Sequence, residues 1–255
     1  MKDQRSQAER ADIKLRISKL QKLMQDAGMQ SMLVSSNANI FYTTGLIFRG
    51  YVYIPAQGEE RWLVMRPSWE GEGILRIRKP EQIGEALASV GIQLPASVGV
   101  EYGTLSYSDF LRLSAALGVS ATPDSTPLLS QARMIKTPYE QELMRRDGIH
   151  HVAAYSRIPH LYQEGMSDIE LQIEIEKKLR EEGCLGGNQM EINLGSVLAG
   201  ENADAPSPYD FLLGGAGQSA GFPLGADGTI LRPGMTVMVD MNGNFYGYMC
   251  DMSRV

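Results

Sequence analysis

The sequence predicts two successive domains, an α/β domain over residues 1–130 and an α+β domain over residues 131–255. Short apolar runs alternate with helical patterns up to about residue 118, which is typical of α/β structure. Segment 121–127 contains two prolines, an aspartate and a serine, the composition of a linker. After it, helical patterns come first and glycine-broken β runs follow, the order expected of an α+β domain.

In the first domain, residues 6–27 carry apolar side chains at helical spacing, and Gly28 suits the end of that helix. Residues 35–39 are polar and predict a turn. The remaining elements are recognised by apolar runs or helical periodicity. We expect strands at 32–34, 51–54, 62–65 and 98–101, and helices at 81–90 and 108–117.

In the second domain, Thr137-Pro138 followed by Glu140 has the residues of a helix start, and Pro159 should end or kink that helix. Ser167 and Glu170 form the pattern of a capping box, which predicts a second helix to about residue 182. Short β runs then follow between glycines. They lie at 190–194, 211–213, 236–241 and 247–254.

Composition excludes several classes of protein. The 255 residues carry a net charge of −6 with dispersed basic side chains, which does not fit a nucleic-acid-binding protein. No apolar run approaches the roughly 20 residues of a membrane span, and the polar N-terminus is not typical of a signal peptide. Cys184 and Cys250 show no pairing pattern, which favours a reducing compartment. We expect a cytoplasmic protein without nucleic-acid or membrane partners.

Two aspartates are the strongest candidate site. Asp240 ends one apolar run and Asp251 lies in the next, with an Asn-Gly hairpin signal between them. Adjacent antiparallel strands would bring both carboxylates to one face. No lysine or histidine lies within ten residues of either aspartate, so a bound cation is the favoured way to offset the two like charges.

The alternative is that both aspartates flank a turn and face solvent, the usual setting of this residue type. Their position inside apolar strands favours the metal interpretation. Oxygen ligands suit Mn²⁺ best, with Mg²⁺, Co²⁺ or Zn²⁺ also possible. The adjacent histidines His150 and His151 face different sides of a helix, so we expect them to be exposed or structurally bonded rather than ligands.

Three segments together resemble the pita-bread metallopeptidases, in the branch of the Xaa-Pro aminopeptidases, prolidases and creatinase. The Asp-to-Asp spacing of eleven agrees with the metal-binding hairpin of that family. The other matching residues occur in the family order along the chain. They are Asn39–Gly45, Ala132–Glu140, Leu231–Met235, Gly247-Tyr248, Arg254 and Gly243, the last displaced by one position from the family pattern.

The resemblance implies a creatinase-type N-terminal domain followed by the first half of a pita-bread catalytic domain. It also implies five metal ligands, of which Asp240 and Asp251 are two and the other three would follow Val255. The family often carries a substrate-contacting histidine in the loop where this chain has Phe222-Pro223. We therefore expect Phe222 and Pro223 to contact substrate and creatinase-like hydrolysis to be disfavoured.

The function implied by the resemblance is hydrolysis of Xaa-Pro bonds in short proline-containing peptides. The resemblance also implies a homodimer and two divalent metal ions, with Mn²⁺ as the first choice and Co²⁺ or Zn²⁺ as alternatives. The catalytic base stays unidentified, and the chain as given is expected to be truncated midway through the catalytic domain and inactive alone. The rival hypothesis is a non-catalytic protein of the same fold that binds peptides or proteins, or a decayed copy.

Overall fold

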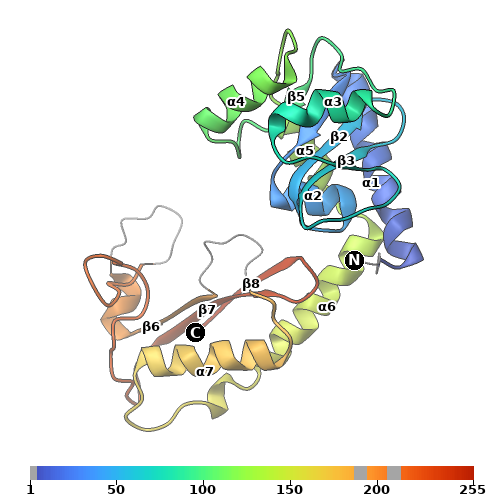
Figure 1. The fold of residues 1–255 in the computed structure, drawn as a ribbon. Helices are drawn as coiled ribbons and strands as arrows, with labels where there is room; N and C mark the ends of the chain where they lie inside the picture. The colour runs from blue at the N-terminus through green and yellow to red at the C-terminus, as the bar shows by residue number, and fades with distance from the viewer. Residues whose placement is uncertain (1–4, 187–193, 206–213) are drawn as a thin grey trace. The chain divides into compact units, whose positions relative to one another are not determined.

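The computed structural model describes residues 5–186, 194–205 and 214–255. The chain divides into two compact units, Met1–Tyr139 and Glu140–Val255 (Figure 1). The domain limits expected from the sequence, 1–130 and 131–255, stay a prediction. Among the described helices, none is both long enough and apolar enough to cross a membrane.

The described part of the first unit is built on a mixed five-stranded sheet of order β4-β3-β2-β1-β5. β1 pairs antiparallel with β2 and parallel with β5, while β3 pairs antiparallel with β2 and parallel with β4. The strands are β1 Ser31–Val34, β2 Arg49–Pro55, β3 Arg61–Arg66, β4 Ile74–Arg76 and β5 Gly99–Val100. The helices are α1 Gln7–Asp26, α2 Asn37–Thr44, the 3-10 helix η1 Pro80–Gln82, α3 Ile83–Ala88, α4 Tyr107–Leu117 and α5 Thr126–Met134.

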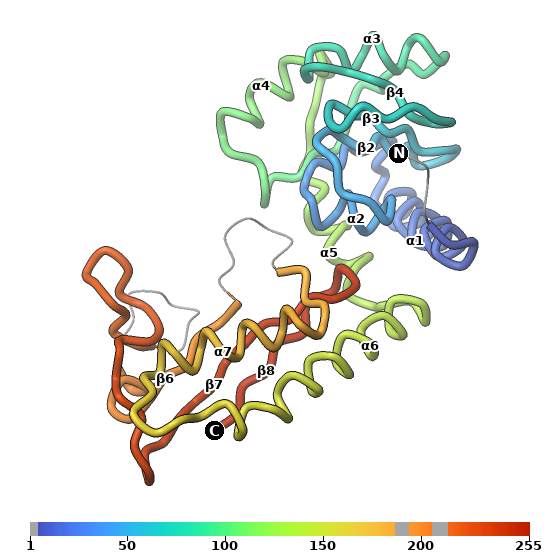
Figure 2. The backbone as a smooth tube through the Cα atoms, turned by 60° about the horizontal axis from the view of Figure 1, so that its bottom comes forward, coloured from blue at the N-terminus to red at the C-terminus, as the bar shows by residue number. Residues whose placement is uncertain are grey.

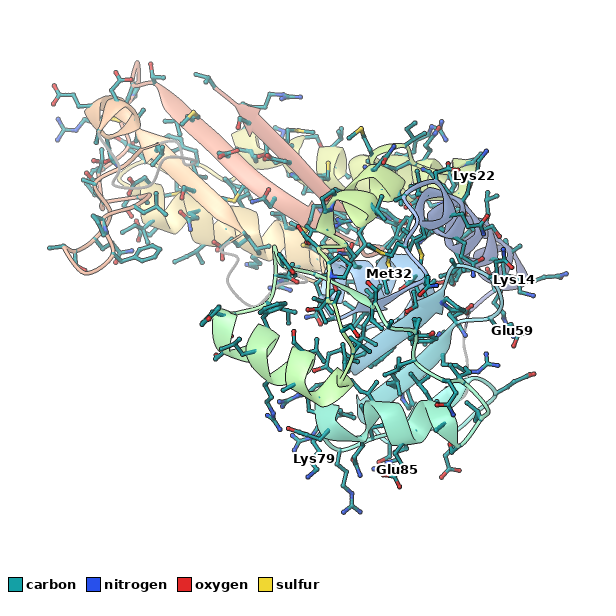
Figure 3. The ribbon with its side chains drawn as sticks, turned by 90° about the horizontal axis from the view of Figure 1, so that it is seen from above. Lys14, Lys22, Met32, Glu59, Lys79 and Glu85 are labelled. Carbon is teal, nitrogen blue, oxygen red and sulfur yellow. The ribbon has the colours of Figure 1, made fainter. Side chains whose placement is uncertain are left out.

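Apolar side chains cover both faces of this sheet because successive strand residues point to opposite sides. Met32 and Val34 belong to the core cluster that α1, α2 and α5 complete. Leu33 belongs to the opposite cluster, with α3 and α4. Figure 3 shows Met32 inside the unit, whereas Lys14 and Glu85 project from its surface. Helices on both faces of a largely apolar sheet confirm the α/β class.

The described part of the second unit holds an antiparallel sheet of order β6-β7-β8, covered on one face by two long helices (Figure 2). Val239 and Met241 from the sheet pack with Tyr155 of α6 and Ile175 of α7. The elements are α6 Pro138–Tyr155, the 3-10 helix η2 Ile158–His160, α7 Asp168–Glu181, β6 Gly195–Ala199, the 3-10 helix η3 Gly200–Asp204, β7 Val237–Asn244 and β8 Met249–Arg254.

Several boundaries follow the expected local signals. α6 begins at Pro138 and ends at Tyr155, before Pro159. The Ser167–Glu170 capping box opens α7, with both of its reciprocal hydrogen bonds present. These signals depend only on residues close together in the sequence, which explains why the sequence alone predicts the helix boundaries.

Two expectations were wrong. The polar turn at 35–39 is instead the start of α2, because the Ser36 hydroxyl accepts a hydrogen bond from the Asn39 amide and caps the helix. The linker at 121–127 contains the start of α5, where Pro127 is tolerated in the first helical turn. Strands β4 and β6 were not expected. The run at 211–213 and nearly all of 190–194 lie outside the described residues.

Candidate functional site

The β7–β8 hairpin places the two aspartates on one face. Asp240 on β7 lies opposite Ser253 on β8, and Asp251 lies opposite Asn242. Because strand residues alternate, all four side chains point to the same side of the ribbon. Asp240 is half-buried and Asp251 is exposed. The strand pairing that the sequence predicted for these carboxylates is therefore present.

The pair is diagonal across the ribbon, a relation that puts two residues about 7–8 Å apart, within reach of a shared cation. The Ser253 hydroxyl donates to Asp240 Oδ1 at 2.5 Å and fixes one carboxylate oxygen. Neither aspartate has an ion-pair partner among the described residues. The Arg254 guanidinium instead donates to the Ser253 backbone carbonyl at 2.6 Å.

These donors fit part of a metal site. Carboxylate oxygens are suitable ligands for a hard divalent cation, and the amide oxygen of Asn242 lies on the same face. Over residues 5–186, 194–205 and 214–255, however, no group of three or more His, Cys, Asp or Glu side chains is arranged to hold a metal ion. Asp240 and Asp251 could supply two ligands, and a closed coordination sphere would need others.

The loop that carries Phe222 and Pro223 packs against β6 beside this face. A Cβ atom on Gly225 would lie 2.8 Å from the hydroxyl of Ser196, the residue that pairs with Asp240 on β6. Asn202 anchors the same loop, since it donates to the Gly225 carbonyl and accepts from the Ala216 amide. Phe222 is 53% exposed on this anchored loop. Whether Phe222 and Pro223 contact substrate stays a prediction.

Helix α6 approaches the hairpin from the opposite face. Tyr155 accepts a hydrogen bond from the Met241 amide at 3.0 Å and donates to the Met252 carbonyl. Burial is the main cause that raises the pKa of Tyr155, and the carboxylates of Asp240 and Asp251 add to it. The hydroxyl therefore keeps its proton and stays a donor at neutral pH.

Two more polar residues of α6 face the hairpin. Asp147 is buried, and its Oδ1 accepts from the amides of Phe245 and Tyr246 at 2.9 and 3.0 Å. Burial raises the pKa of Asp147, although these two hydrogen bonds oppose the rise. His151 is fully buried beside Gly243, whose Cβ would lie 2.8 Å from Nδ1 of the ring.

The sequence interpretation of the histidines was correct for only one of them. His150 stacks on Phe245 at 5.2 Å between ring centroids and lies 3.2 Å from the Tyr246 hydroxyl. His151 is neither exposed nor structurally bonded, since its ring nitrogens have no partner of normal hydrogen-bond geometry. Burial is the main effect on His151 and lowers its pKa. The Asp251 carboxylate and the Cys250 backbone act in the opposite direction, and the net lowering favours the neutral ring.

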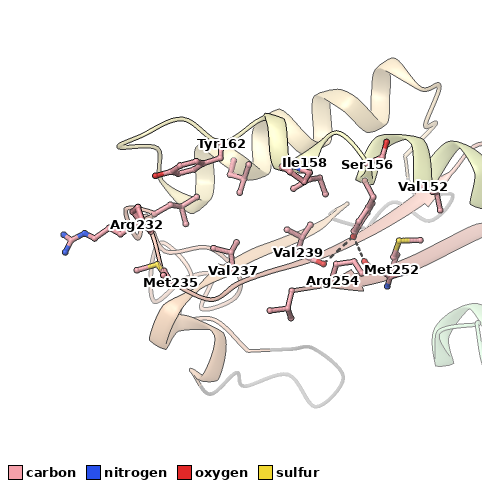
Figure 4. A pocket seen from close by; sticks show the side chains of 17 residues that line it. Val152, Ser156, Ile158, Tyr162, Arg232, Met235, Val237, Val239, Met252 and Arg254 are labelled. Atoms are coloured by element: carbon pink, nitrogen blue, oxygen red, sulfur yellow. Dashed lines mark hydrogen bonds between the residues drawn. The ribbon is translucent and has the colours of Figure 1, made fainter.

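An apolar cavity of about 660 Å³ lies on the α6 side of the hairpin, away from the carboxylates. Val152 and Ile158 line it from the helical side, and Val239 and Met252 line it from the strands (Figure 4). Alternation along β7 and β8 separates these side chains from Asp240 and Asp251 by the thickness of the sheet. The cavity and the carboxylate face are therefore separate features.

The sequence missed Ser253, Asn242 and Tyr155 as members of this region. Ser253 and Asn242 could have been found from the hairpin register, because each lies two residues from an aspartate. Tyr155 had a weaker signal, since Asp147, His151 and Tyr155 recur every four residues on one helix. Their contact with the hairpin depends on tertiary packing.

Two family models match the chain, and together they cover most of it. The creatinase/prolidase N-terminal domain matches residues 16–135, and metallopeptidase family M24 matches residues 142–255. The uncharacterized peptidase YqhT of Bacillus subtilis is 21% identical in an alignment 252 residues long, which covers 94% of this chain and 64% of that protein.

Solved structures show the same fold. The Xaa-Pro dipeptidase from Bacillus anthracis superposes with a TM-score of 0.75 at 20% identity, over 95% of this chain and 64% of that one. Prolidase from Pyrococcus furiosus gives 0.73 at 19% identity, over 93% of this chain and 69% of that one. The chain thus spans about 64% of the length of the relatives first matched. It belongs to the creatinase/prolidase group of M24 metallopeptidases, with the N-terminal domain of that group and part of its pita-bread domain.

Proposed function

We propose that the whole protein hydrolyses Xaa-Pro bonds in short peptides and that Asp240 and Asp251 are two of its metal ligands. The observation that carries the proposal is the pair of carboxylates on one strand face, without a cationic side chain bonded to either in the described residues. The match to family M24 over residues 142–255 supports it. So do the structural neighbours that are named Xaa-Pro dipeptidase and prolidase.

The finer features of the proposal come from the resemblance. They are two divalent ions, Mn²⁺ before Co²⁺ or Zn²⁺, a homodimer, a cytoplasmic location and inactivity of this chain alone. Free Cys184 and Cys250 support a reducing compartment. Bound divalent ions would supply Lewis-acid polarisation of a peptide carbonyl and a water of lowered pKa.

The described residues would act by holding and orienting. Asp240 would bind through one carboxylate oxygen while Ser253 donates to the other, which fixes the direction of the group. Asp251 would bind from the facing strand. Phe222 and Pro223 would offer an apolar contact to the peptide from the loop beside β6. His151 has no assigned role in catalysis in this proposal, because it is fully buried on the α6 side of the hairpin.

The test is hydrolysis of an Xaa-Pro dipeptide and a short Xaa-Pro peptide with added Mn²⁺. We expect no turnover by this 255-residue chain, and turnover by any product of a coding sequence that continues past Val255 with a histidine and two glutamates. In that longer product, Asp240→Asn or Asp251→Asn should reduce kcat by at least about a hundredfold, because metal loading fails. Full activity of both variants would refute the ligand assignment.

A second candidate is a non-catalytic protein of the same fold that binds peptides. The observation that favours it is the exposed side chain of Phe222 on a loop anchored by Asn202, an apolar contact for a peptide that needs no metal. It predicts that the longer product binds a proline-containing peptide without cleaving it, whether or not Mn²⁺ is present. Peptide cleavage that depends on Mn²⁺ would exclude this candidate.

A further inference from the structure

Helix α6 presents a polar stripe to the hairpin that carries both aspartates. Asp147, His151 and Tyr155 recur every four residues, so they lie along one face of the helix. All three are buried against the hairpin. A core-facing helix stripe is ordinarily apolar, so three polar residues in it are the informative exception.

Tyr155 makes the contact that bears on the site. Its hydroxyl accepts from the amide of Met241 and donates to the carbonyl of Met252, and the Val239 carbonyl lies 3.5 Å away. The dashed lines in Figure 4 mark the bonds that end on Val239 and Met252. Met241 and Met252 face each other across the two strands. The hydroxyl therefore joins β7 to β8 at one register position.

That position lies between the two candidate ligands. Met241 follows Asp240 directly, and Met252 follows Asp251 directly. Their side chains point toward α6, while the carboxylates point to the other face. Tyr155 thus holds the peptide unit that joins Asp240 to Met241 and, on β8, the carbonyl of the residue that follows Asp251. Any change in strand separation there moves one carboxylate relative to the other.

Asp147 secures the other end of the hairpin. It accepts from the amides of Phe245 and Tyr246, which lie in the connection between β7 and β8. Gly243 permits the close approach of the helix, because any Cβ there would collide with His151 and Phe245 at 2.8 and 2.9 Å. Asp147 therefore holds the turn of the hairpin, and Tyr155 fixes the distance between the two strands near the aspartates.

We propose that Tyr155 is a positioning residue, whose hydroxyl bridges β7 and β8 at the spacing at which Asp240 and Asp251 can share a metal centre. The inference rests on the proposed role of these two aspartates as ligands. A buried hydroxyl that only satisfies its own hydrogen bonds would contribute to stability but would not alter the ligand field or affinity of a bound ion.

The experiment uses the 255-residue chain with Co²⁺ as the probe. Tyr155→Phe removes the hydroxyl and keeps the ring, and Tyr162→Phe is the matched control on a half-exposed tyrosine of the same cavity. We expect Tyr155→Phe to weaken Co²⁺ binding by about tenfold or more and to shift the visible d–d absorption of the bound ion. Tyr162→Phe should leave both unchanged. Wild-type affinity and an unchanged spectrum in folded Tyr155→Phe would overturn the proposal.

A second measurement separates this inference from the proposed function. If the wild-type chain binds no Co²⁺, the two aspartates do not hold an ion in this chain, and the bridge is judged by amide hydrogen exchange. Exchange at the Met241 amide that is at least tenfold faster in Tyr155→Phe, with distant amides unchanged, would support the bridge, and equal exchange would overturn it.

Should Tyr155→Phe fail to fold, NMR of the wild-type chain tests the bridge instead. A slowly exchanging Tyr155 hydroxyl proton with a nuclear Overhauser effect to the Met241 amide supports the bridge, and its absence overturns it.

Discussion

Asp147 supports the hairpin of the candidate site, but its carboxylate is buried, which is unfavourable for the charged form. Its carboxylate holds two backbone amides of the hairpin, but its second oxygen, Oδ2, has no hydrogen-bond partner in the described structure. Burial raises the pKa of Asp147, so the folded chain binds this proton more tightly than the unfolded chain. The resulting stabilisation is present at low pH and is lost as pH rises through the raised pKa.

This linkage gives a testable pH dependence. Asp147→Asn keeps an oxygen acceptor for the amides of Phe245 and Tyr246 and removes the buried charge. We expect the free energy of unfolding of Asp147→Asn, minus that of the wild type, to grow between about pH 4 and pH 7. Urea unfolding at a series of pH values measures it. Asp26→Asn, at an exposed position in α1, controls for the loss of one negative charge. A difference that shrinks as pH rises would contradict the prediction.

At the scale of residues, the sequence predicted the position of the aspartates but not what surrounds them. Asp240 and Asp251 were found because the spacing of a hairpin is a local property. Tyr155 was missed because its partners lie 86 and 97 residues away, at Met241 and Met252. Contacts over such separations depend on how a helix packs on a sheet, which no local pattern specifies.

At the scale of elements, local signals decided which predictions succeeded. The capping box of α7 was predicted from Ser167 and Glu170, and the structure contains both of its hydrogen bonds. The start of α2 was missed because Ser36 and the residues after it have the composition of a turn as well as of an N-cap. β6 was missed because five residues that begin with glycine and serine carry little strand signal by themselves.

The capping box also supplies a prediction at this scale. Ser167→Ala removes the acceptor for the Glu170 amide, so it should lower the free energy of unfolding by about 1 kcal/mol. Chemical denaturation followed by circular dichroism measures the change. Ser18→Ala is the matched control, since Ser18 is an exposed residue inside α1 where alanine is a better helix former. Equal or greater stability of Ser167→Ala would show that the cap does not contribute.

At the scale of the whole molecule, the order of motifs along the chain predicted the fold class and the family. The pattern of burial could not be predicted in the same way. Asp240 and Asp251 face outward on β7 and β8, while Asp147, His151 and Tyr155 are buried behind them. A polar residue in a helical pattern predicts a solvent-facing position, and only the packing of the helix on the sheet shows that it is buried. The site therefore combines residues that sequence identifies with a support that only the three-dimensional structure reveals.

The central claim is that the carboxylate face of the β7–β8 hairpin binds divalent metal. The most direct test is titration of Mn²⁺ into the 255-residue chain, compared with Asp240→Asn, Asp251→Asn and the surface control Asp26→Asn. We predict that the wild type and Asp26→Asn bind Mn²⁺ weakly and retain less than one ion per chain after dialysis. Asp240→Asn and Asp251→Asn should bind no Mn²⁺. Equal Mn²⁺ binding by all four proteins, or none by the wild type, would contradict the claim.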